Sequence, residues 1–288
     1  MSLRYCARQF TAAEIEGIRQ LIADHPHHNR AQLSRLVSEQ LHWLRADGRW
    51  KEMSCRVAML RMQADGLIQL PAPLKGNGNR TPYRRRSPAT DPELLPVLEP
   101  AGALADLHLD LVRGAQASHL WNEYIDRYHY LGYRPLPGAQ LRYVARAQQR
   151  PLALLGFGAA AWKSHMRDAF IGWTPDRRES RLHLIVNNAR FLILPWVRSR
   201  NLASRLLAMV AKRLAEDWYE RYRYRPVLVE TFVEIPRFRG TCYRAANWIY
   251  LGDTQGRGKL DVHRTARLPR KSVWVHPLTP HFRRLLCD

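Results

Sequence analysis

Four side chains beyond residue 120 are of types that carry acid–base, nucleophilic or metal chemistry: His129, Asp168, Glu230 and Tyr243. Glu230 lies in an apolar, β-prone stretch, where its carboxylate can act as a base or hold a metal. His129 lies between tyrosines and can serve as general base for a neighbouring tyrosine nucleophile. Tyr243 is the alternative nucleophile. We therefore interpret these four as candidate catalytic residues.

Each assignment has a structural alternative. Glu230 can pair with a neighbouring arginine, Tyr243 can pack, and the rings around His129 can pack or stack on bases. The candidate metal ligands are Glu230 and Asp168, with His129 as a third, and the expected ion is Mg²⁺ or Mn²⁺. These residues are far apart in sequence, so their meeting in space is an expectation about the fold.

Basic residues dominate the charge. Lys+Arg 46 minus Asp+Glu 25 gives a net charge of +21, and most of the basic residues are arginines. Such a surface attracts polyanions, and the planar guanidinium group can bind phosphate or guanine edges through two hydrogen bonds. DNA is therefore the expected partner, with membrane surfaces and acidic proteins as alternatives.

The first 72 residues predict a small helical module. Apolar periodicity and capping residues indicate helices over 12–24, 29–47 and 53–64, followed by a short strand over 67–70. This order is that of a winged helix, whose third helix enters the DNA major groove. Arg56 and Arg61 on that helix are accordingly candidate DNA-binding residues.

Prolines and glycines from 73 to 104 predict a flexible basic linker. It contains Arg84, Arg85 and Arg86, which can follow a phosphate backbone or stay solvated. The predicted organisation is a winged-helix-like module over 1–72, this linker, and a second domain over 105–288.

The second domain has a mixed pattern. Strands are predicted over 107–112, 141–147, 152–162, 183–194, 226–233 and 249–251, with helices over 117–128, 201–214 and 240–248. The longest helix links two strands that can lie parallel. The fold class is therefore α/β (α+β), with a mixed sheet and helices on both faces.

The helix expected to begin at Asn201 is flanked by Arg198 and Arg200, and such a helix N-terminus suits a phosphate. Residues 189–205 resemble the acetyl-CoA loop of GNAT acyltransferases. Residues 240–252 resemble a late helix of that family in which a tyrosine acts as general acid, a role that would fall to Tyr243. The loop lacks the glycines that let a backbone approach pyrophosphate, so acetyl-CoA is not the expected cofactor.

A series of motifs in order resembles the DruA family, named for a component of the Druantia anti-phage systems. They are HYLGY at 129–133, GAQLRY at 138–143, GFGAAAWK at 156–163, RD at 167–168, IGW at 171–173, NNARFLILP at 187–195, NLAS at 201–204, ETFV at 230–233, RGTCYRAANW at 239–248 and TQGRG at 254–258. The resemblance covers about 105–277 and extends to the helical module. It implies a place in defence loci or beside transposase-like proteins, and it points to DNA.

We therefore expect a DNA-binding and DNA-processing protein of a mobile genetic element or anti-phage defence system, which cleaves or transfers strands like a nuclease or transposase. Arg237 and Arg239 complete its candidate DNA-binding residues. The alternatives are a non-catalytic DNA-binding protein with a degenerate GNAT-like domain and a GNAT-type acyltransferase. Homodimerisation and binding to other proteins of the same locus stay open.

Apolar stretches such as 191–197 are far shorter than the roughly 20 residues that a membrane span needs, and the N-terminus has no signal-peptide pattern. The expected location is the cytoplasm. The four cysteines form no CxxC pair, so we expect free thiols.

Overall fold

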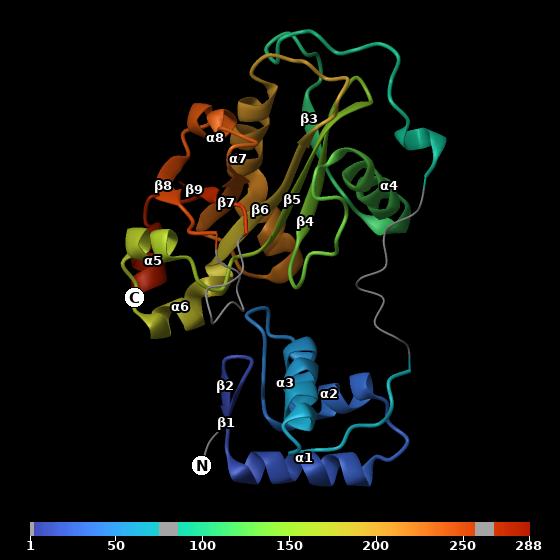
Figure 1. Ribbon diagram of the computed structural model, residues 1–288, viewed down its shortest axis with the longest axis vertical. Helices are drawn as coiled ribbons and strands as arrows, with labels where there is room; N and C mark the ends of the chain where they lie inside the picture. The colour runs from blue at the N-terminus through green and yellow to red at the C-terminus, as the bar shows by residue number, and fades with distance from the viewer. Residues whose placement is uncertain (1–2, 75–85, 257–267) are drawn as a thin grey trace. The chain divides into compact units, whose positions relative to one another are not determined.

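The computed structural model describes residues 3–74, 86–256 and 268–288 (Figure 1). The chain divides into two compact units, residues 1–80 and 81–288. Of the predicted DNA-binding residues, Arg84 and Arg85 lie outside the described residues. No helix among the described residues is long and apolar enough to cross a membrane.

The smaller unit is a β-hairpin followed by three helices. Its elements are β1 (Leu3–Tyr5), β2 (Arg8–Phe10), α1 (Ala12–Asp24), α2 (Arg30–Gln40) and α3 (Glu52–Ala64). Thr11 and Asn29 cap α1 and α2 through capping boxes, as their sequence positions predict. The core is formed by residues of all five elements, including Phe10, Ile18 and Met62.

The order of strands and helices differs from the predicted winged helix. The strand expected over 67–70 is absent from the described part of this unit, and the hairpin lies before the helices. Side chains and helix carbonyls take the place of a strand partner. Gln63 Oε1 accepts the Leu70 N–H at 2.9 Å, and the Leu67 N–H donates to the carbonyl of Met62.

The larger unit is built on a seven-stranded mixed sheet in the order β3-β4-β5-β6-β7-β9-β8. The strands are β3 (His108–Leu111), β4 (Leu141–Ala147), β5 (Arg150–Ala159), β6 (Ile185–Ile193), β7 (Leu228–Glu234), β8 (Ile249–Asp253) and β9 (Lys271–Pro277). All neighbouring strands are antiparallel except β6 and β7. The predicted mixed sheet is confirmed.

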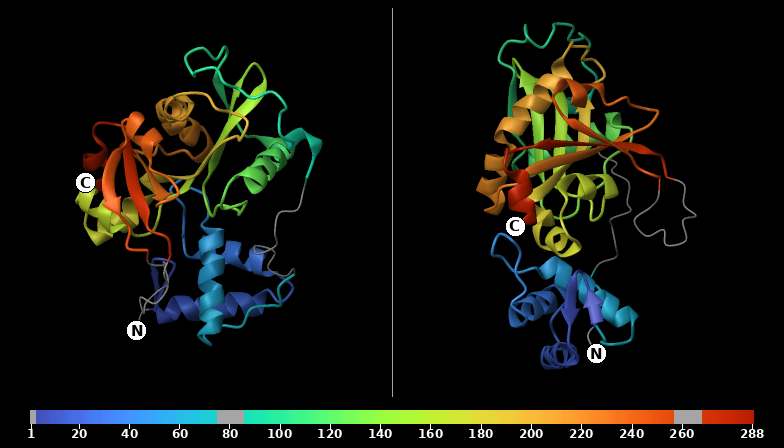
Figure 2. Two further views of the ribbon diagram at one scale, coloured as in Figure 1. Left: turned by 45° about the horizontal axis from the view of Figure 1, so that its top comes forward. Right: turned by 90° about the vertical axis from the view of Figure 1, so that its left-hand side faces the viewer.

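Helices cover both faces of this sheet, as predicted (Figure 2). They are α4 (Gly114–Tyr128), α5 (His165–Ile171), α6 (Pro175–Arg181), α7 (Leu202–Tyr222), α8 (Thr241–Ala245) and α9 (Phe282–Cys287). Arg142 of β4 contacts Asn122 of α4, whereas the next residue, Tyr143, contacts Asp217 of α7. Because adjacent strand residues point to opposite faces, α4 and α7 lie on opposite sides of the sheet.

β6 and β7 separate soon after they begin. Their parallel pairing covers three residue pairs, the last of which is Asn187 with Glu230. Beyond that point, Thr231 Oγ1 still donates to the carbonyl of Asn188 at 3.1 Å. Towards their C-terminal ends, β6 and β7 are therefore no longer paired, and an opening lies between them.

The second half of the expected linker packs on the larger unit, which differs from the predicted flexible segment over 73–104. Val97 is buried and exchanges backbone hydrogen bonds with the loop before α7, accepting from Arg198 at 2.8 Å. Thr90 is also buried, and its hydroxyl donates to Glu123 of α4 at 2.6 Å. A proline-rich composition does not exclude such a segment, because the rest of the domain supplies its partners.

Candidate functional site

The fold brings Glu230 and Asp168 together across one guanidinium group. Arg167 on α5 is fully buried, and its Nη1 lies 2.9 Å from Glu230 Oε2. Its Nη2 lies 2.8 Å from Asp168 Oδ1. The other oxygen of Glu230 accepts the backbone N–H of Ala161 at 2.6 Å. The arginine pairing considered for Glu230 is therefore present, and its partner is Arg167.

Both carboxylates of this network therefore already accept hydrogen bonds from protein groups. Burial raises the pKa of Glu230, an effect that the charge of Arg167 opposes. Asp168 also accepts N–H groups from Trp173 at 3.1 Å and Ser164 at 3.3 Å. The described residues include no cluster of three or more His, Cys, Asp and Glu that could hold a metal. The pair as it stands does not fit a divalent ion, because a guanidinium fills the space between the carboxylates.

Tyr243 on α8 is 6% exposed and forms part of the packing around the β6–β7 opening. Its hydroxyl donates to Asn188 Oδ1 at 2.9 Å. Its ring lies 5.0 Å from that of Trp248 and 6.3 Å from that of Phe191, and burial raises its pKa. A hydroxyl held in this way by a neutral amide has no base to activate it.

His129 follows α4 and is almost buried. Burial, together with the positive charges of Arg190 and Arg237, lowers its pKa to about 4, so the ring is neutral at pH 7. Nδ1 accepts the Leu131 N–H at 3.2 Å, which places the proton of a neutral ring on Nε2. In this tautomer the imidazole is not a base towards Tyr130, whose ring centroid lies 4.9 Å away.

Five residues form what we call the basic-aromatic cluster: Tyr130, Arg134, Arg190, Arg237 and Phe238. The Arg237 guanidinium lies 4.6 Å from the centroid of the Tyr130 ring, and the Phe238 ring meets Tyr130 edge-on at 5.3 Å. Phe238 is 46% exposed. The cluster combines cationic groups with an accessible aromatic face.

The position of the cluster follows from the separation of β6 and β7. Arg190 lies on β6 beyond the last pair with β7, and Arg237 and Phe238 follow the end of β7. Arg190 Nε is buried without a hydrogen-bond partner, and the charge of Arg134 acts on it. The structure thus brings His129 close to Arg237, two of the predicted site residues, while Arg239 is exposed beside Phe238.

The N-terminus of α7 carries the other predicted anion site. Arg198 and Arg200 are exposed, and Asn201 has a left-handed backbone with φ 64°. The Arg198 N–H donates to the carbonyl of Val97 at 2.8 Å, and Arg200 accepts from the N–H of Ala101 at 2.9 Å. The loop is therefore pinned by the chain before β3. Of the loop groups held by these two bonds, only the Arg198 N–H is a donor that an anion could use.

On the smaller unit, α3 does not present the basic face expected of a groove-binding helix. Met53, Val57 and Leu60 are its large exposed residues, and Arg61 is exposed near its end. The side chain of Arg56 turns towards α2, with Nε 3.4 Å from Ser34 Oγ. Arg86, at the start of the described part of the larger unit, pairs with Asp126 at 2.9 Å.

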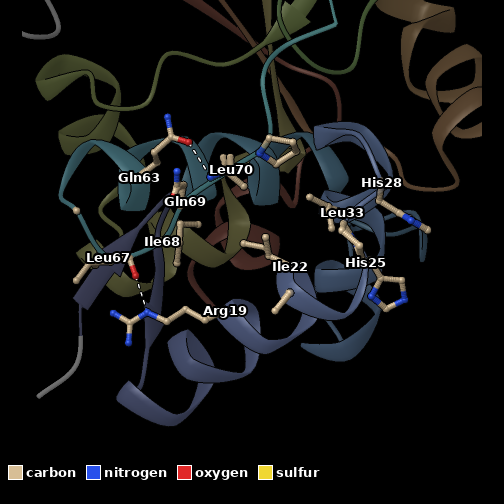
Figure 3. A pocket seen from close by; sticks show the side chains of 14 residues that line it. Arg19, Ile22, His25, His28, Leu33, Gln63, Leu67, Ile68, Gln69 and Leu70 are labelled. Carbon is tan, nitrogen blue, oxygen red and sulfur yellow. Dashed lines mark hydrogen bonds between the residues drawn. The ribbon is translucent and has the colours of Figure 1, made fainter.

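A hollow on the smaller unit lies between α1, α3 and the segment after α3 (Figure 3). Two of its polar side chains hold backbone groups. Arg19 Nε donates to the carbonyl of Leu67 at 2.7 Å, and Gln63 accepts from Leu70. These contacts hold the extended segment in place, and His25 and His28 also line the hollow.

Sequence reasoning missed Arg167 and Arg190. Arg167 stands beside Asp168 in a short motif, which singled out the dipeptide but not the carboxylate 63 residues away that it pairs with. Arg190 occupies a strand, where a basic residue signals solvent or a ligand. Phe238 carried a weaker signal, as an aromatic residue between two arginines.

The larger unit is thus a mixed α/β domain with a cationic, aromatic opening at the ends of two parallel strands. The chain matches the family described as Druantia protein DruA over residues 63–273, and it belongs to that family. A comparison with curated proteins finds no match.

Solved structures similar to this chain include several acetyltransferases. Spermidine/spermine N-acetyltransferase SpeG from Vibrio cholerae has a TM-score of 0.38 at 10% identity, covering 62% of this chain and 96% of that one. The polyamine N-acetyltransferase of Drosophila melanogaster has a TM-score of 0.37 at 13% identity, covering 59% and 100%. The acetyltransferase yncA from Salmonella typhimurium has a TM-score of 0.32 at 12% identity, covering 49% and 66%.

Proposed function

We propose that this protein binds DNA within an anti-phage defence system, and that the basic-aromatic cluster is its principal contact. The observation that carries the proposal is that the arginines of the cluster form no ion pair with a carboxylate of the described residues, although Glu234 lies near Tyr130. Within the described residues, none of Arg134, Arg190 and Arg237 forms an ion pair. By contrast, Arg146 lies 3.0 Å from Asp110, and Arg150 lies 2.7 Å from Glu93.

Neighbouring positive groups that form no ion pair repel one another, so the free energy of the cluster falls when an anion approaches. Burial lowers the pKa of Arg190, which shows how poorly its charge is solvated. A phosphate chain supplies regularly spaced acceptors for several guanidinium groups at once. The net charge of +21 and membership of a family named for an anti-phage system support DNA as that polyanion.

The test compares two charge-matched double variants for binding to short labelled DNA by fluorescence anisotropy. Arg237→Gln with Arg239→Gln removes one exposed arginine of the cluster and the exposed arginine that follows Phe238. Arg146→Gln with Arg150→Gln removes the same charge from arginines that already have carboxylate partners. We expect the first pair to weaken binding by roughly tenfold or more and the second to weaken it far less.

Equal losses in the two double variants would contradict the assignment of the cluster, because they would indicate attraction by net charge alone. Absence of binding by the wild-type protein would contradict DNA binding itself. Circular dichroism spectra of both variants should match the wild type, since all four side chains lie at least partly in solvent.

Strand cleavage or transfer stays a prediction, with a tyrosine route and a metal route. The Tyr130 ring lies 4.6 Å from the Arg237 guanidinium, whereas Tyr243 and Glu230 are held in buried contacts. Incubation of labelled DNA with the protein, with and without Mg²⁺ or Mn²⁺, tests both routes on denaturing gels. A protease-sensitive adduct lost in Tyr130→Phe would support the tyrosine, and metal-dependent products without an adduct would support the metal.

A second candidate function is acyl transfer. The observation that favours it is the separation of β6 and β7 with a long helix starting after β6, which gives room for a ligand between two strands. Isothermal titration with acetyl-CoA tests this function. The contact of Val97 with the Arg198 N–H, together with the lack of glycines in the loop before α7, leads us to expect no binding.

A further inference from the structure

We infer that the basic-aromatic cluster holds an unpaired nucleobase against the ring of Phe238, so that single-stranded DNA is the preferred ligand of this protein. This inference rests on the proposed function and adds the form of DNA that the site takes. The side chain of Phe238 is 46% exposed, although a phenylalanine has no polar atom that would favour contact with water.

The ring of Phe238 is held from one side by its neighbours. Tyr130 meets it edge-on, with ring planes at 61°, and the Arg237 guanidinium lies 5.8 Å from its centroid. Its backbone N–H donates to the carbonyl of Glu234 at 2.9 Å, which fixes the turn after β7. The ring is therefore a positioned surface on which a flat group can stack.

Guanidinium groups around this ring are placed to contact the phosphates that flank a stacked base. Arg237 is adjacent in sequence, and the charge of Arg190 on β6 acts on Tyr130, the ring that Phe238 meets edge-on, although the Arg190 Nε itself is buried. The acidic group facing the cluster is Glu234, whose charge acts on Tyr130. Aromatic side chains combined with a cationic track are how proteins bind single strands without reading sequence.

A base inside a duplex has both faces covered by its neighbours, so it cannot stack on Phe238 without leaving the helix. An unpaired base offers its face without the cost of unpairing and unstacking. The same chemistry therefore predicts a preference for single strands, and also for duplexes that contain an unpaired base.

Trp162, on another part of the larger unit, is also an exposed aromatic residue beside an arginine. It is 38% exposed, and the Arg178 guanidinium lies 5.8 Å from its ring. That guanidinium faces Asp168, with Nη1 3.8 Å from the carboxylate. The cation beside Trp162 thus has a carboxylate within ion-pair distance, which the guanidinium groups of the cluster lack among the described residues, although Asp168 also pairs with Arg167 and the Arg178 Nε has no partner.

The experiment measures the affinity of the full-length protein for a labelled single strand and for the duplex of the same sequence. Phe238→Leu keeps an apolar side chain and removes the stacking face. Trp162→Leu is the matched control, and Phe238→Trp tests rescue by a larger aromatic ring. We expect Phe238→Leu to weaken single-strand binding about tenfold, with little effect on the duplex, and Phe238→Trp to bind as the wild type does.

The dependence of affinity on salt separates stacking from phosphate contacts. Phe238→Leu should leave the slope of log K against log salt unchanged, whereas Arg237→Gln should reduce it by roughly 0.7 for a single strand. Equal wild-type affinity for the two DNA forms, or equal losses in Phe238→Leu and Trp162→Leu, would overturn the inference while leaving DNA binding intact. Failure of the wild type to bind either form would instead refute the proposed function.

Discussion

At the scale of single residues, Arg167 forms ion pairs with both acidic site candidates. It is fully buried, and it contacts Glu230 and Asp168 simultaneously. A charge in this environment is tolerated only while it is paired. The network also links α5 to β7, because Glu230 lies on that strand. Its energetic role can be measured apart from any activity.

Removing the guanidinium should destabilise the fold strongly. We expect Arg167→Leu to lower the free energy of unfolding by about 3–5 kcal/mol, because the Glu230 carboxylate would remain buried without its cation. The double variant Arg167→Leu with Glu230→Leu should recover part of this loss. Urea unfolding followed by circular dichroism measures both values. A single variant as stable as the wild type would contradict this role for the pair.

The neutral state of His129 predicts a pH dependence of stability. Its folded pKa of about 4 lies below the value of about 6.5 for an unfolded chain, so the unfolded state gains a proton first as the pH falls. Stability attributable to this residue is thus complete above pH 6.5 and is lost between about pH 6.5 and 4. The full loss is on the order of 3 kcal/mol.

The test compares the wild type with His129→Asn, which keeps an acceptor near the position of Nδ1 for the Leu131 N–H. Denaturant unfolding at pH 7.5, 6 and 5 should show a smaller decrease with pH in the variant. Parallel decreases in the two proteins would show that other groups account for the change.

At the scale of elements, local patterns predicted most strands and the main helices of the larger unit. The predicted strand 141–147 coincides with β4, and the helix predicted over 201–214 corresponds to α7, which continues to Tyr222. The sequence analysis missed β9, whose place between β7 and β8 depends on pairing between distant segments. It also missed the first hairpin, because Cys6 and Ala7 at its turn are not typical turn residues.

Predicting the site required information that spacing does not contain. The types of residue suggested an arginine partner for Glu230 and packing for Tyr243, and both arrangements occur. Which arginine pairs with Glu230 depends on the loop and helix after β5. The cluster around Phe238 depends equally on the end of α4 meeting the end of β7.

The packed segment before β3 makes a prediction at this scale. Glu123 on α4 accepts hydrogen bonds from the Ser87 hydroxyl at 3.2 Å and the Thr90 hydroxyl at 2.6 Å. Glu123→Ala would leave these donors unsatisfied, at a cost of roughly 1–3 kcal/mol each where they stay buried. We therefore expect faster cleavage by a non-specific protease within 86–104.

Glu220→Ala is the control for that experiment, because Glu220 also carries a negative charge on a helix but is exposed and lies 3.5 Å from Arg113. Its cleavage pattern should match the wild type. Mass spectrometry of the early fragments locates the cuts. Equal rates in the two variants would show that Glu123 does not hold the segment.

At the scale of the whole molecule, two units present arginines to solvent, and the net charge of +21 is spread over both. Attraction by this overall charge raises the rate of association with any polyanion. Contacts with individual phosphates instead determine how steeply the affinity falls with salt, because each contact releases condensed counterions. In the proposed complex with DNA, the salt dependence of the affinity therefore measures how many arginines contact phosphates.

Binding through the basic-aromatic cluster alone would involve three guanidinium groups, those of Arg134, Arg190 and Arg237. For a single strand, the slope of log K against log salt should then be about −2, from roughly 0.7 per phosphate contact. A slope near −5 or steeper would require further contacts, for which Arg61 on the smaller unit is an exposed candidate. Anisotropy titrations of the wild type and Arg61→Gln across a salt series distinguish the two cases. If the cluster acts alone, the two slopes coincide, because Arg61 then contributes to the field around the protein and to no phosphate contact.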